Sequence, residues 1–131
     1  MPAISAYLEK AILDWTLGGA TPARPANWWL GIAVGTPTLT GASEMGTLSG
    51  YSRLTLSMAA ANSPQGSATN LNAMTFGPFS SVGSAIGADI FDGSPVGSSD
   101  LLWYGTLATA RTFGIGDTLI FIAGALTTAI S

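Results

Sequence analysis

The chain has 131 residues, of which 47% are hydrophobic and only 8% are charged, against about 25% charged in an ordinary soluble domain. Without Cys or His it can form no disulfide, no thiolate or imidazole metal site and no histidine-based catalytic centre. The net charge of −3 and four scattered basic residues argue against nucleic acid as a partner, and the length favours one domain over residues 1–131.

The first predicted element is a helix at about residues 4–17. Ser5 or the residues just before it are candidates for the N-cap, and Gly18 and Gly19 provide a stop. Residues 21–27, with two prolines, should form an extended connector. The apolar residues recur at helical spacing, so we expect their stripe to pack on a sheet or on a neighbouring subunit. The stripe consists of Ile4, Leu8, Ala11, Ile12 and Trp15.

Short strands are predicted next, at residues 28–34, 51–60, 69–76 and 86–90, because apolar residues alternate there between Gly- and Pro-rich turns. The longest predicted loop, residues 35–50, contains Glu44 as its only charge. A loop of this length in a compact domain is often functional, so we expect it to contact a partner.

Residues 101–113 and 118–130 are two long apolar runs on either side of the turn 114–117, and they predict a central β-hairpin. Strands at these intervals are typical of an antiparallel β-sandwich or jelly roll. We therefore predict a mainly β fold, with the sandwich at about residues 28–131 and one N-terminal α-helix.

The sequence contains no convincing catalytic, cofactor or metal site. Asp89, Asp92 and Asp100 lie near one another, but acids in such turns usually bond to their own backbone. Serine has no histidine or nearby lysine to activate it. We expect no enzyme activity, no cofactor and no bound metal. The N-terminus lacks a signal-peptide pattern and the run 118–130 is too short to span a bilayer, so we also expect no membrane association.

Two adjacent aromatic pairs, Trp28–Trp29 and Trp103–Tyr104, cannot each point into a single core, because neighbouring residues on a strand face opposite sides. One member of each pair should be buried. The other should contact a partner surface, lie beneath the helix or, less favoured, stack on a sugar. We expect Trp29 and Tyr104 to be the partner-facing members.

Arg53 and Arg111 lie in predicted strands with few charges nearby, so each should be solvated or paired with an Asp. At an assembly interface, arginine would be a natural anchor. We therefore expect both arginines, with Glu44 of the long loop, to contribute to a contact surface.

Five segments carry a family resemblance: AISAYLEKAILDWTLGGA, WWLGIAVGTPT, GYSR, MTFGPF and LLWYGTLATARTFGIGDTLIFIAGALTTAIS, within residues 3–131. In this order they resemble a family of small structural proteins of tailed bacteriophages that are commonly labelled phage tail fibre proteins. The resemblance implies a virion protein assembled in the cytoplasm of the bacterial host.

Within that class, a compact domain of low charge suits repeated docking on a shell. We expect a capsid decoration or cement protein that binds the major capsid protein. The alternative is a tail fibre or tail-tip protein that contacts other tail proteins and the host surface. Because so few charges keep single copies apart, we also expect a homo-oligomer.

Overall fold

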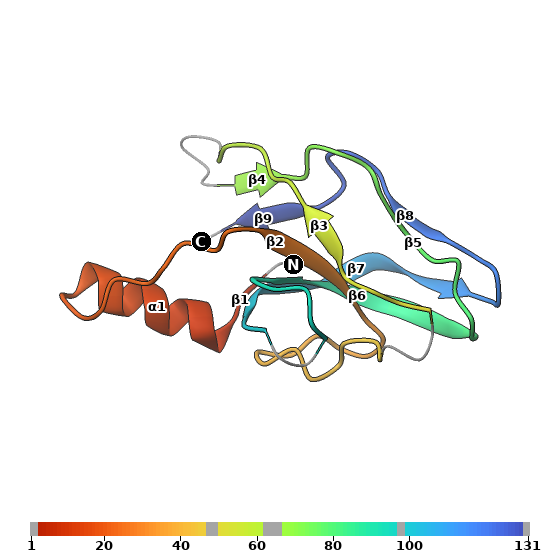
Figure 1. The fold of residues 1–131 in the computed structure, drawn as a ribbon, viewed down its shortest axis with the longest axis horizontal. Coiled ribbons are helices and arrows are strands. Elements are labelled where there is room, and N and C mark those ends of the chain that lie inside the picture. Colours follow the sequence, from red (N-terminus) through yellow and green to blue (C-terminus); the bar gives the residue numbers. More distant parts are fainter. Residues whose placement is uncertain (1–2, 47–49, 62–66, 97–98, 130–131) are drawn as a thin grey trace.

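The computed structural model describes residues 3–46, 50–61, 67–96 and 99–129 (Figure 1). Within these ranges 41% of the chain is strand and 9% helix, and every strand pair is antiparallel. The predicted fold class, mainly β with one N-terminal helix, is confirmed. The elements are β1 (Ala3–Ile4), α1 (Ala6–Thr16), β2 (Trp28–Ala33), β3 (Leu54–Leu56), β4 (Ser67–Thr69), β5 (Met74–Phe76), β6 (Gly83–Phe91), β7 (Leu101–Phe113), β8 (Leu119–Phe121) and β9 (Thr127–Ala129).

A five-stranded central sheet, in the order β1-β7-β6-β2-β3, divides the molecule. Two small sheets, β5–β8 and β4–β9, cover one face, and the segment that follows β2 covers the other (Figure 1). Asn70 joins the small sheets, because its amide nitrogen donates to the Ile122 carbonyl (3.0 Å) and its amide oxygen accepts from the Leu126 amide (2.9 Å). The central strands are therefore enclosed between two layers.

The core fills the space between the central sheet and β5–β8, where aromatic rings contact one another. Phe79 stacks on Phe113 with ring centroids 3.9 Å apart, and Phe76 meets Phe121 edge-on at 6.0 Å. The strand period of two places alternate residues on this face. The aliphatic partners of these rings include Leu30, Ile32, Leu56 and Leu102.

The predicted C-terminal hairpin is wrong in its pairing, although its turn forms. The Asp117 amide donates to the Gly114 carbonyl (3.1 Å), and Gly116 has a φ of +84° that favours glycine. The two arms then separate, since β7 pairs with β6 and β1 while β8 pairs with β5. The Phe79 carbonyl, which accepts from the Gly116 amide at 2.7 Å, holds the turn at the edge of the core. The turn thus carries the chain between layers.

The long hairpin of the structure is instead formed by β6 and β7, joined by residues 92–100. The Asp92 amide donates to the Asp100 carbonyl (3.1 Å), and the Asp100 amide donates to the Asp92 carboxylate (2.9 Å). These two acids therefore stabilise a connection between strands, in the backbone-bonding role expected of acids in turns.

Three of the predicted strands are shorter or divided in the structure, whereas the strand predicted at 86–90 is lengthened to β6. Strand 51–60 is reduced to β3, strand 69–76 is replaced by β4 and β5, and the run 118–130 is divided between β8 and β9. The predicted turn at 62–66 lies outside the described residues. Divided strands allow one segment to contribute to both small sheets.

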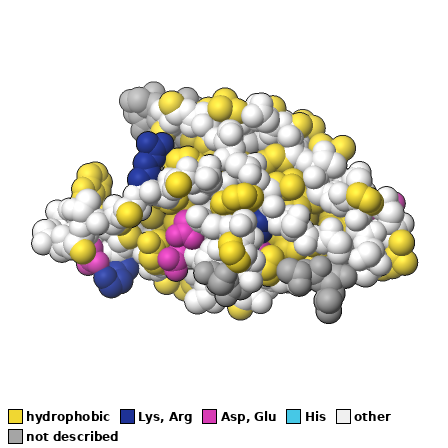
Figure 2. Space-filling view, viewed as in Figure 1, with side chains coloured by type: hydrophobic (Ala, Val, Ile, Leu, Met, Phe, Trp, Pro, Cys, Tyr) yellow, Lys and Arg dark blue, Asp and Glu magenta, His cyan; other side chains and the backbone are white. Residues whose placement is uncertain are grey.

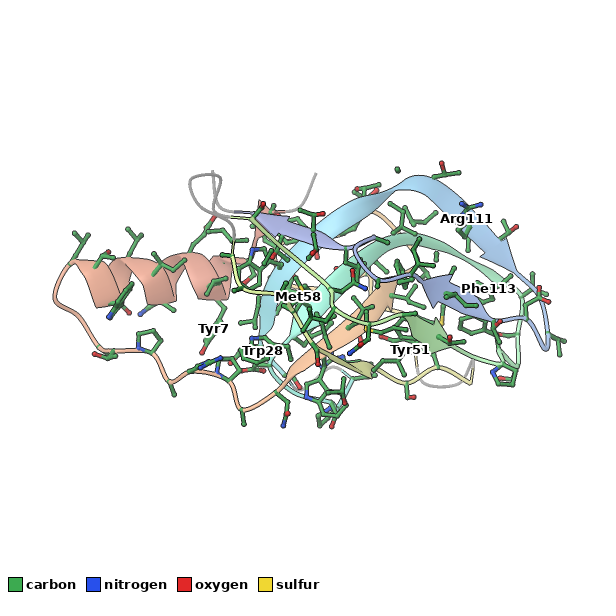
Figure 3. All side chains as sticks on the ribbon, turned by 90° about the horizontal axis from the view of Figure 1, so that it is seen from above. Tyr7, Trp28, Tyr51, Met58, Arg111 and Phe113 are labelled. Carbon is green, nitrogen blue, oxygen red and sulfur yellow. The ribbon has the colours of Figure 1, made fainter. Side chains whose placement is uncertain are left out.

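The helix begins and ends close to its predicted limits. Of the two predicted packing partners, the chain's own sheet and a neighbouring subunit, the sheet contacts little of the helix. Ser5 is the N-cap, and its hydroxyl accepts from the Leu8 amide (3.1 Å) and donates to the Leu101 carbonyl. No residue of α1 is buried, and only Leu8 of its stripe packs against the core. The helix and the returning connector project beyond the sheets as an arm, residues 6–27 (Figures 1 and 3). Packing of the stripe on the chain's own sheet is therefore limited to its first turn.

The aromatic core gives a direct test of this layer arrangement. Phe76 is 1% exposed, so Phe76→Ala should lower the free energy of unfolding by about 3–5 kcal/mol through lost contacts and a cavity. Val82, 77% exposed, is the control, and Val82→Ala should change it by less than about 0.5 kcal/mol. Urea unfolding measures both, and equal effects would contradict the core described.

Candidate functional site

A buried cluster of charged side chains lies between the central sheet and the segment covering its outer face. Arg53 donates to both carboxylate oxygens of Glu44, from Nε and Nη2, each at 2.6 Å. Its Nη1 donates to the Gly93 carbonyl (2.8 Å), and its guanidinium lies 3.4 Å from the centroid of the Phe91 ring. Such a two-point pair fixes the orientation of both partners.

Tyr51 extends this cluster to the edge of β2. Its hydroxyl donates to Glu44 (2.7 Å) and accepts from the Ile32 amide (3.1 Å). Burial, aided by the hydrogen bond and the negative charge of Glu44, raises the pKa of Tyr51 far above its usual range, so the phenol remains a neutral donor. Gly31 provides the space, since a Cβ there would lie 2.7 Å from the Tyr51 hydroxyl.

Asp89 is the third charged residue of the cluster and pairs with Gly31 across β2 and β6. It is fully buried, and within the described residues neither carboxylate oxygen has a hydrogen-bond partner. Burial, followed by the negative charge of Glu44, raises the pKa of Asp89 from 3.8 to about 7, although Arg53 opposes the shift. Near neutral pH the carboxyl therefore exists in both protonation states.

The cluster holds the covering segment, residues 35–46, against the sheet. The side chains of Arg53 and Glu44 are only 1% and 6% exposed, so neither has appreciable surface to offer a partner. Both were expected at a contact surface, and Arg53 was expected to be solvated or to pair with an Asp. It pairs with Glu44 instead, because the loop predicted to face a partner folds over the sheet.

The other predicted contact residues lie elsewhere. Trp29 and Tyr104 are half-buried, whereas Arg111 is exposed on β7 (Figure 3). The strand alternation places Trp28 and Trp103 on the opposite face from Trp29 and Tyr104. The structure therefore does not gather the predicted contact residues in one place, and their contact with a partner stays a prediction.

A groove that the sequence analysis missed opens between the central sheet and β4–β9. It consists of two hollows of about 230 and 360 Å³ that share Ile90, Trp103 and Thr128. Trp28 and the residues after β3 continue its wall, and Arg24 stands at one hollow. In the sequence, the groove is indicated by the three small side chains of Ala59–Ala61, which are not large enough to fill the space beneath β4–β9.

The arm beside this groove presents apolar side chains to solvent. An isolated helix of 11 residues is marginal in water, and apolar side chains on it gain nothing from exposure. Figure 2 shows hydrophobic side chains along the arm and on the body, and several of the charged side chains in this view gather around the arm. The exposed large side chains of the arm are Tyr7 (43%), Leu13 (57%), Trp15 (63%) and Leu17 (79%).

The described residues contain no group of three or more acids that could hold a metal ion. Asp89 is buried within the sheet. Asp92 and Asp100 instead form hydrogen bonds with each other in the turn between β6 and β7. Across the same described ranges, no helix is long and apolar enough to cross a membrane. The exposed arm and the groove are two surfaces that could contact another molecule, and further large apolar side chains are exposed elsewhere, including Val82, Ile115 and Ile122.

One family model matches residues 3–129 of the chain, which takes in the arm, all three layers and the groove. Its description is "Podophage GP4 fiber I protein gp80". No curated protein matches the chain.

The buried ion pair can be tested by removing one partner. Arg53→Met leaves the Glu44 carboxylate buried without its cation, so the free energy of unfolding should fall by about 3–5 kcal/mol. Arg111→Met is the matched control, because this arginine is exposed on a strand, and it should have an effect below about 0.5 kcal/mol. If urea unfolding finds the two variants equally stable, the pair does not hold the covering segment.

Asp89 gives the protein a dependence of stability on pH. Since its pKa is higher in the folded state, folding favours the protonated carboxyl, and its stabilising contribution is complete below about pH 4 and lost as the pH rises to about 7. At pH 8, Asp89→Asn should therefore be more stable than the natural chain by up to about 4 kcal/mol. The difference should shrink towards pH 4. Thermal unfolding across this range checks the trend, and parallel curves for the two proteins would contradict it.

Proposed function

The chain belongs to the family of the podophage GP4 fiber I protein gp80 and is a structural component of a phage virion, and we propose that it is a subunit of a tail fibre. The fibre assignment is supported by the membership in a family of fiber proteins and by a match that covers residues 3–129 of the chain. It takes precedence over capsid decoration, the role that composition alone favoured. A shell-binding role has no comparable support.

The observation that carries an assembly role is the uncovered apolar arm. A subunit that works inside a larger particle can expose such a surface before assembly, because a partner buries it afterwards. The low charge of the chain is consistent with this, since 8% charged residues do little to keep copies apart. We therefore include a homo-oligomer and contact with other virion proteins in the proposal.

The proposed subunit is not an enzyme. The perturbed pKa values at Tyr51 and Asp89 belong to side chains enclosed between layers, where they act on stability. Neither residue lines the groove. A substrate would therefore find no titratable group there that the sequence or the geometry prepares for catalysis.

The position on the particle can be tested by electron microscopy of purified virions labelled with an antibody against this chain. The proposal predicts gold particles on the fibres around the tail and a band in the tail fraction after capsids and tails are separated. Label spread over the shell, with a copy number comparable to that of the coat protein, would establish decoration instead. Absence of the chain from virions would overturn both roles.

A further inference from the structure

The exposed face of α1 combines one acidic and two large apolar side chains. Glu9 and Leu13 are four residues apart and lie on one side of the helix, and Leu17, the C-cap, follows at the same spacing. Leu13 is 57% exposed and Leu17 is 79% exposed. Lys10 already pairs with Asp14, which leaves Glu9 as the acid of α1 without an ion pair within the described residues. This face is suited to an apolar site with a positive charge at its rim.

The groove offers these properties on the same chain. Its lining is mainly apolar, with Trp28, Met58 and Trp103 as the large side chains of the wall. Arg24 is the charged residue that lines it, and its guanidinium lies 5.2 Å from the centroid of the Trp28 ring. No ion pair to Arg24 is found in the described part of the chain. The groove therefore presents a cation beside an apolar surface.

The helix does not fill the groove of its own chain. None of its residues lines either hollow, and the helix extends away from the sheets in both views, while Arg24 of the returning connector lies at the groove (Figures 1 and 3). Ser5 fixes the direction of the arm at its base, since its amide donates to the Leu102 carbonyl (2.9 Å) and its hydroxyl to the Leu101 carbonyl. The complementary surfaces are thus held apart within one copy.

We propose that α1 of one copy docks in the groove of a second copy of this chain, with Glu9 facing Arg24 and with Leu13 and Leu17 against the apolar wall. This inference deepens the proposed role as a fibre subunit and rests on it. A helix of 11 residues is about 16 Å long and lays its apolar side chains into such grooves at spacings of three and four residues.

A second copy is the favoured occupant because each chain supplies one helix and one groove of opposite charge. Every helix added to an assembly brings a matching site, so the two surfaces are always present in equal number. Exchange between two copies would close a dimer, whereas passing each helix to the next copy would form a ring or a longer assembly. Both arrangements use the same contact.

Disulfide trapping tests this contact directly, since the chain has no cysteine of its own. Chains carrying Leu13→Cys are mixed with differently tagged chains carrying Ala60→Cys, a groove residue, under mild oxidation. The expected product is a disulfide-linked pair containing both tags. Val82→Cys in place of Ala60→Cys is the control, because Val82 is exposed outside the groove, and it should give little product.

Charge exchange measures the contribution of the polar contact. Arg24→Glu and Glu9→Arg should each weaken self-association by about tenfold or more, because like charges then face each other. The double variant should recover most of the loss. Light scattering during size-exclusion chromatography gives the mass of each assembly, and thermal unfolding confirms that each variant is folded.

A natural chain that remains monomeric would overturn the inference. So would an oligomer that is insensitive to these charge changes and whose Leu13→Cys and Ala60→Cys variants form no disulfide. In the second case, α1 binds to another surface of the chain or to another virion protein. These results do not depend on where the chain lies on the particle. Label on the shell with an intact helix contact would instead remove the fibre assignment alone.

Discussion

The central sheet needs cover on both faces, and the rest of the structure depends on how that cover is attached. On one face, the cover is a layer of aromatic and aliphatic side chains from β5 and β8. On the other face, the covering segment is anchored by the pair Arg53–Glu44, which also bonds to Tyr51 and to the Gly93 carbonyl. A buried pair costs desolvation, so it stabilises mainly when all its hydrogen-bonding groups are used. Here the guanidinium donates from all three of its nitrogens.

This use of charge explains part of the unusual surface. The chain has 11 charged side chains, and three of them, Glu44, Arg53 and Asp89, are in the buried cluster. The outside is therefore even poorer in charge than the composition suggests (Figure 2). A surface of this kind does little to oppose association, in agreement with the structural role of a virion protein.

The cover is incomplete where the arm and the groove expose apolar groups. The β4–β9 sheet has only three residues in each strand and faces small side chains, so the layer does not close over Trp28 and Trp103. The arm has an N-cap and an ion pair but no buried residue. Its local hydrogen bonds set its conformation, while the free energy of burying its side chains is left for a partner.

The sequence alone determined what depends on neighbours along the chain. Helical spacing, Ser5 and the Gly18–Gly19 stop defined α1, and turn residues located the reversals at 92–100 and 114–117. Tertiary structure decided which strands pair, because the two arms around 114–117 enter different layers, where β7 pairs with β6 and β1 and β8 pairs with β5. It also decided that Arg53 meets Glu44 inside the molecule. That contact depends on how the 35–46 segment folds over the sheet, which no local pattern of residues encodes.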